Sequence, residues 1–190
     1  LDDDSLYISS GTWSLLGVTT DNPLTNLNSM QSNYSNEGGI NKTVRYQKNI
    51  PGMWIVNRLR DELCPTISFT DIVDMARKSA FGEAVDINDE IFLSPKSMKQ
   101  AFDSKLVNKP TTRADYFRSA YISIAIGYKK AIDELKANTN KTYSKLYIVG
   151  GGAKNAFLNE LTAKATKMQV IPLPIEATAI GNLRIQIENA

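Results

Sequence analysis

Apolar residues recur along the second half of this chain at the spacing that is typical of a buried helix. From Thr112 to about Lys136, the large or apolar side chains are three or four positions apart: Phe117, Tyr121, Ile124, Tyr128, Ala131 and Leu135. Side chains at that spacing share one face of a helix. Thr112 and Asp115 resemble a capping box, with Asp in place of the usual Glu or Gln. We therefore predict a long helix that begins there and buries one face.

The first fifty residues show the shorter patterns that are typical of strands. We predict strands over residues 6–9 and 14–18, joined by a tight turn at Ser10-Gly11-Thr12-Trp13, and a third strand over residues 43–47. The polar stretch between them contains Asn36-Glu37-Gly38-Gly39, which we predict to be a second glycine turn. Together these elements indicate an antiparallel meander.

Helices are predicted to follow the meander. Pro51 suits the first turn of a helix that continues to about residue 63, and Thr70 can cap the next helix. Residues 81–95 have no useful period, and a short helix is predicted between residues 97 and 107.

Strands return after the long helix and alternate with helices. The pattern predicts a strand over residues 146–149, a turn at Gly150-Gly151-Gly152, a helix to about Lys167, a strand over residues 169–171 and a last helix from near Glu176. This order favours an α/β fold in which a mixed β-sheet is flanked by helices, with ligands at the ends of the strands.

The three glycines are the first candidate for a binding site. A strand that ends in glycines and opens a helix brings bare backbone N–H groups and the positive end of a helix dipole to one point. Gly150, Gly151 and Gly152 would also let a flat ring or a phosphate approach the main chain. A tight turn without a ligand explains the same residues. A dinucleotide-binding turn fits poorly, because the spacing is not G-x-G-x-x-G and no acidic residue ends a strand about 20 residues later.

Composition excludes several classes of function. The chain has 190 residues, a net charge of +2, one cysteine and no histidine. The absence of histidine removes Ser-His-Asp and Cys-His catalysis, and the near-neutral charge gives no reason to expect nucleic acid or an anionic membrane as a partner. Cys64 follows an apolar helical pattern and is predicted to be a buried thiol. We expect a soluble cytoplasmic protein without membrane spans.

Three separate stretches of the chain carry a resemblance to one family, and they lie in the same order. They are Ile8-Ser9-Ser10-Gly11-Thr12-Trp13-Ser14; Asn36-Glu37-Gly38-Gly39 with Lys48-Asn49-Ile50-Pro51-Gly52-Met53-Trp54; and Val149-Gly150-Gly151-Gly152-Ala153-Lys154-Asn155 with Glu176-Ala177-Thr178-Ala179-Ile180-Gly181-Asn182. In these stretches the chain resembles the rhamnulokinases, which belong to the FGGY carbohydrate kinase family.

The resemblance implies a fold, an activity and a place in a larger enzyme. Residues 1–190 would be the C-terminal nucleotide-binding domain of a two-domain kinase, with an actin-like ATPase or ribonuclease H-like fold. That enzyme would use ATP and Mg²⁺ to convert L-rhamnulose to L-rhamnulose 1-phosphate. The general-base aspartate is expected N-terminal to Leu1, so no catalytic residue and no metal ligand is expected here. Both ends of the chain look cut, and most of the sugar site is expected outside it.

The resemblance also assigns roles to single residues. Thr12 corresponds to a threonine near the nucleotide phosphates, and Asn49 to an asparagine assigned to contact with the sugar or active site. Asn57 stands where the family often has a glutamine that contacts ATP. Gly151 corresponds to the glycine that packs on the adenosine, and Asn155 to the asparagine beside it.

Simpler explanations exist for the same side chains. Thr12 can bond its own turn, and Asn155 can be an ordinary helix cap. Trp13 and Trp54 are expected in the core or in an interdomain contact, and Lys48 as a solvated charge. Two further functions stay open, namely a kinase for another ketose or pentulose and a non-catalytic actin-like nucleotide-binding module.

Overall fold

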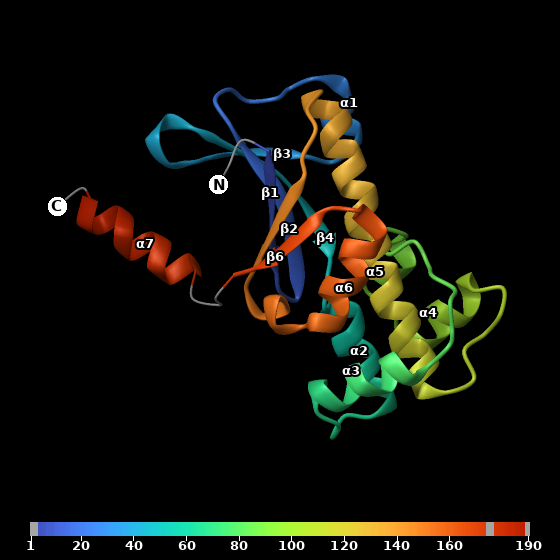
Figure 1. Ribbon diagram of the computed structural model, residues 1–190. Coiled ribbons are helices and arrows are strands. Elements are labelled where there is room, and N and C mark those ends of the chain that lie inside the picture. The colour runs from blue at the N-terminus through green and yellow to red at the C-terminus, as the bar shows by residue number, and fades with distance from the viewer. Residues whose placement is uncertain (1–3, 174–176, 189–190) are drawn as a thin grey trace.

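One mixed sheet organises the computed structural model, which describes residues 4–173 and 177–188 (Figure 1). Its six strands lie in the order β3-β4-β2-β1-β5-β6. The strands are β1 (Ser5–Ser10), β2 (Trp13–Thr20), β3 (Ser35–Gly38), β4 (Val44–Pro51), β5 (Lys145–Val149) and β6 (Gln169–Pro172). Pairing is antiparallel through β3, β4, β2 and β1, and parallel from β1 to β5 and from β5 to β6. The predicted meander and mixed sheet are confirmed.

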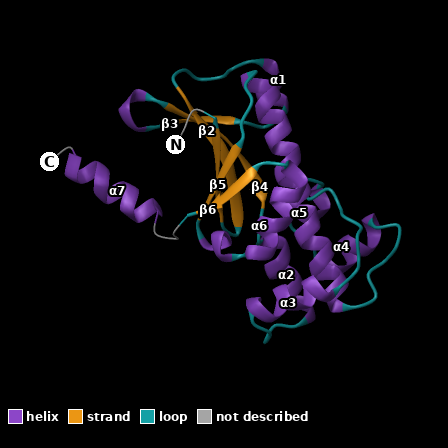
Figure 2. Ribbon diagram, in the orientation of Figure 1, coloured by secondary structure: helices purple, strands orange, loops and turns teal. Residues whose placement is uncertain are grey.

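Helices lie beside the sheet and below its lower end (Figure 2). The described helices are α1 (Leu27–Gln31), α2 (Trp54–Leu63), α3 (Phe69–Lys78), α4 (Met98–Lys105), α5 (Arg113–Thr139), α6 (Ala156–Thr166) and α7 (Ala177–Glu188). Three short 3₁₀ helices accompany them: η1 (Ile40–Lys42), η2 (Glu90–Phe92) and η3 (Gly151–Lys154). Glu176, the predicted start of the last helix, lies outside the described residues. No described helix is both long and apolar enough to cross a bilayer.

The core lies between the sheet and α5. Alternate residues of the central strands are fully buried, among them Leu6, Ile8 and Leu16, and α5 buries the predicted stripe from Phe117 to Leu135 against them. Thr112 caps α5 and forms the predicted capping box with Asp115. Successive strand residues point to opposite faces, so the residues between the buried ones form a second sheet face. Figure 1 shows α7 on the side of the sheet away from α5.

Three local predictions are wrong. Asn36-Glu37-Gly38 is not a turn but part of the edge strand β3, whose four residues are all exposed. An edge strand with both faces exposed to solvent needs no alternation of apolar residues. Its sequence therefore cannot be told from that of a polar loop. Pro51 is the last residue of β4, paired with Trp13, and does not begin a helix. Ser68, not Thr70, caps α3, by accepting a hydrogen bond from the Asp71 amide.

Candidate functional site

A cavity of about 620 Å³ lies at the carboxyl ends of the parallel strands β1 and β5. It is bounded by the β1–β2 turn, the first turns of α2, one side of α3 and the glycine turn. Five of the seven predicted binding residues line it: Thr12, Asn57, Gly151, Gly152 and Asn155. These residues lie up to 143 positions apart in the chain, so the fold brings them together as the resemblance implied.

The glycine turn is shaped by two of its three glycines. Gly150 has a φ of +83°, a conformation that side chains rarely adopt. A Cβ on Gly152 would lie 1.9 Å from the Ser10 hydroxyl oxygen, whereas a Cβ on Gly151 would meet no atom within 4 Å. Gly150 and Gly152 are therefore required by the turn itself, and Gly151 is the glycine that faces open space. Gly150 supports the turn but does not line the cavity.

The helix predicted after the glycines is confirmed. The 3₁₀ helix η3 intervenes, and α6 starts at Ala156 after an Asn155 cap. The Asn155 side-chain oxygen accepts a hydrogen bond of 3.0 Å from the Leu158 amide. Asn155 is thus a helix cap that also lines the cavity.

The β1–β2 turn is fastened to the start of α2 by main-chain hydrogen bonds. The Met53 amide donates to the Gly11 carbonyl at 3.1 Å, and the Trp54 amide donates to the Thr12 carbonyl at 2.9 Å. These bonds leave the exposed Thr12 side chain at the rim of the cavity. Asn57, half-buried on the first turns of α2, lies in the same wall.

Three buried hydroxyl groups underlie these turns. The Ser14 hydroxyl oxygen lies 2.6 Å from that of Tyr128, and the Ser10 hydroxyl oxygen lies 3.4 Å from it. Burial raises the pKa of Tyr128, and this effect outweighs the hydrogen bonds with Ser10 and Ser14, which lower it. The phenol therefore stays neutral. A Cβ on Gly52 would lie 2.4 Å from the Ser14 hydroxyl oxygen. The sequence carried a signal that we missed: both serines occupy inward positions of their strands, where apolar residues are usual.

An apolar wall of the cavity was also not predicted. Phe69 and Val73 of α3 line it, together with Met53. Arg77, one turn after Val73, lies in the same wall. Apolar residues of this kind suit a flat, weakly polar group such as a purine.

Asn49 and Lys48 lie away from the cavity. Asn49 is exposed on β4 and does not line the cavity. The Lys48 ammonium lies 2.6 Å from the Glu134 carboxylate of α5, so this lysine is paired rather than solvated. Trp54 packs against the core and donates its indole N–H to the Phe92 carbonyl, whereas Trp13 is 45% exposed.

Comparison with known proteins defines the class. A mixed sheet flanked by helices is the arrangement of the actin-like ATPase fold, to which the FGGY sugar kinases belong. Residues 6–189 match the model of the FGGY family of carbohydrate kinases, C-terminal domain. The chain belongs to this family.

The relatives refine the comparison. The chain is 40% identical to the rhamnulokinase of Bacillus subtilis (strain 168) and 35% identical to that of Oceanobacillus iheyensis, over 98% and 97% of its length. It spans only about 40% of the length of either relative. The ligand-bound xylulose kinase of Lactobacillus acidophilus superposes with a TM-score of 0.67 over 88% of this chain and 34% of that one, at 16% identity. The last comparison supports the fold alone.

Proposed function

We propose that residues 1–190 are the nucleotide-binding C-terminal domain of an ATP-dependent L-rhamnulose kinase, which forms L-rhamnulose 1-phosphate and ADP. The observation that carries this proposal is the single cavity that collects Thr12, Asn57, Gly151, Gly152 and Asn155. The similarity to curated rhamnulokinases along nearly the whole chain supports the choice of sugar.

The geometry supports a definite placement for the nucleotide. The purine would lie between the open backbone of Gly151 and the apolar side chains of Phe69 and Val73. The phosphates would extend towards the β1–β2 turn, where the Thr12 hydroxyl can donate a hydrogen bond to them. Phosphoryl transfer depends mainly on such positioning and on charge stabilisation, and Mg²⁺ bound with ATP would supply part of the latter.

The rest of the active site would come from another part of the full-length enzyme. In this proposal the general-base aspartate and most sugar contacts belong to a preceding domain. Asn49, on the exposed face of the sheet, would lie towards the sugar-binding side of the active site. The cytoplasmic location stays a prediction.

The test is an assay of ADP release by the full-length protein with ATP, Mg²⁺ and a panel of sugars that includes L-rhamnulose and D-xylulose. We expect the highest kcat/KM with L-rhamnulose. A higher kcat/KM for another ketose would mean that this ketose, not L-rhamnulose, is the substrate. The absence of sugar-dependent turnover would contradict the proposal that the protein is a sugar kinase. Residues 1–190 alone should bind ADP weakly and show no turnover, because they lack the general base.

A further inference from the structure

Arg77, a residue of the cavity wall, forms an ion pair with Glu160. Phe69, Val73 and Arg77 follow one another at intervals of four along α3, so they share the helix face that lines the cavity. The Arg77 guanidinium donates two hydrogen bonds, of 2.6 and 2.7 Å, to the two carboxylate oxygens of Glu160. Glu160 lies on α6, one turn after Ala156, which also lines the cavity.

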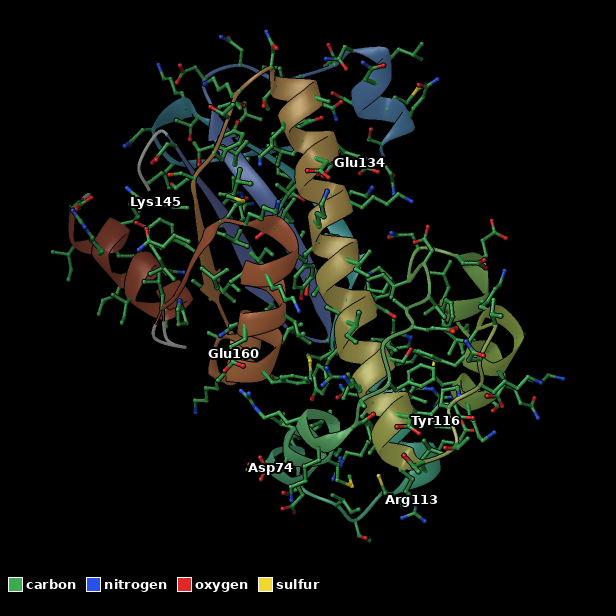
Figure 3. All side chains as sticks on the ribbon, turned by 45° about the vertical axis from the view of Figure 1, so that its right-hand side comes forward. Asp74, Arg113, Tyr116, Glu134, Lys145 and Glu160 are labelled. Atoms are coloured by element: carbon green, nitrogen blue, oxygen red, sulfur yellow. The ribbon has the colours of Figure 1, made fainter. Side chains whose placement is uncertain are left out.

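The pair joins two helices that both pack on α5. α3 packs on α5 through Ile72 and Ala76, and α6 packs on α5 beside them through Phe157. Among the ion pairs of the described residues, Arg77–Glu160 is the one that links α3 to α6 directly. Figure 3 shows the labelled Glu160 on α6 next to α3, the helix that carries the labelled Asp74.

The geometry of the pair is more specific than that of an ordinary surface ion pair. Two parallel hydrogen bonds fix both the orientation of the guanidinium plane and its distance from the carboxylate. The Arg77 guanidinium also lies 4.9 Å from the centre of the Phe157 ring, which is itself buried. An isolated exposed pair contributes little, but a bidentate pair resting on a buried ring has a defined position.

We propose that Arg77 and Glu160 are positioning residues that set the distance between α3 and α6, and through it the width of the cavity and its affinity for adenine nucleotides. This inference rests on the proposed function. Neither residue takes part in phosphoryl transfer. Their loss therefore changes nucleotide binding without changing the chemistry.

The test uses the full-length protein and four variants: Glu160→Gln, Arg77→Glu, Glu160→Arg and the double exchange Arg77→Glu/Glu160→Arg. We expect each single change to raise KM for ATP and the dissociation constant for ADP by roughly three- to tenfold, with kcat and the KM for sugar unchanged. The double exchange should return both constants to within about twofold of the wild type, because it restores an opposite-charge pair across the same gap. Glu37→Gln is a matched control, since Glu37 pairs with Arg45 on β3 and β4, away from the cavity.

Two results would overturn the inference while leaving the proposed function intact. One is a wild-type ADP affinity in Glu160→Gln. The other is a double exchange whose affinity for ADP is no higher than that of Arg77→Glu alone. This result would mean that Arg77 contacts the nucleotide itself. Failure of the wild type to bind ATP would instead contradict the proposed function. Thermal melting of each variant checks that the helices are intact.

Discussion

The hydroxyl oxygens of Ser14 and Tyr128 lie 2.6 Å apart with both side chains fully buried. This contact ties the middle of α5 to the strand that follows the β1–β2 turn. Since Ser10, on the other side of that turn, lies 3.4 Å from the same phenol, Tyr128 holds both ends of the turn that carries Thr12. α5, none of whose residues line the cavity, thereby fixes one of its walls.

Tyr128→Phe should both destabilise the protein and weaken nucleotide binding. The change keeps the ring but leaves two buried serine hydroxyls without this partner, which costs about 1–3 kcal/mol of unfolding free energy. Without these contacts the β1–β2 turn is less firmly held, so the dissociation constant for ADP, measured by calorimetry, should rise. The control is Tyr143→Phe, which removes a buried phenol bonded to Thr139 at the far end of α5. If both variants lose stability and neither loses ADP affinity, the hydroxyl contact is structural only.

Gly151 and Gly152 should respond in opposite ways to an added side chain. Gly151→Val projects into open space, so the variant should fold normally and obstruct the nucleotide, with a raised KM for ATP and an unchanged KM for sugar. Gly152→Ala would press on the buried Ser10 hydroxyl and should lower stability by about 1–3 kcal/mol. Thermal melting and ADP titration of both variants separate the two effects. A Gly151→Val protein that binds ADP normally would remove Gly151 from the site.

Asn155 can be tested for its two roles separately. Asn155→Asp keeps the oxygen that accepts from the Leu158 amide, so α6 should stay capped, whereas Asn155→Ala should cost about 1 kcal/mol. If the amide N–H₂ group also binds the nucleotide, Asn155→Asp should weaken ADP binding without lowering the melting temperature. Asn26→Asp, at the cap of α1, is the matched control. Wild-type ADP affinity in Asn155→Asp would leave capping as the whole role.

Asp115 makes stability depend on pH at the acid end. Burial alone would raise the pKa of this carboxyl, but hydrogen bonds from Ser79 and Thr112 outweigh it and hold the pKa below its usual value. A carboxylate with a depressed pKa in the folded state stabilises fully above its unfolded pKa, and that stabilisation is lost as pH falls through the folded value. Urea unfolding from pH 6 to pH 2 should therefore show a shallower acid decline for Asp115→Asn, and parallel curves for the two proteins would contradict this.

The sequence predicted elements well where one local rule determines them. The stripe along α5 and its Thr112–Asp115 capping box are set by spacing and cap chemistry, and the structure has both. The edge strand β3 was missed because all four of its residues are exposed, so its sequence has no apolar alternation. The site was predicted only in part for a different reason, namely that packing between distant segments forms it. Motifs located the turns at Thr12 and Gly151, but the wall of Phe69 and Val73 and the Arg77–Glu160 pair arise only from the packing of α3 and α6 on α5.

The exposed face of the sheet leads to a last prediction, that it contacts another domain in the full-length protein. Trp13 is 45% exposed on this face, and Asn49 is exposed on the neighbouring strand β4. Trp54, by contrast, packs against the core of this domain and is bonded to Phe92. Residues 1–190 alone should self-associate through the exposed face, because it presents apolar area to water.

Analytical ultracentrifugation of two variants tests this. Trp13→Ala should shift residues 1–190 towards the monomer with little change in melting temperature. Trp54→Ala should leave the association unchanged and lower the unfolding free energy by about 2–4 kcal/mol, since it removes a packed side chain. In the full-length protein Trp13 should be protected from acrylamide quenching, because the preceding domain would cover it. A monomeric wild-type fragment, together with an equally accessible Trp13 in the full-length protein, would place the domain interface on another surface.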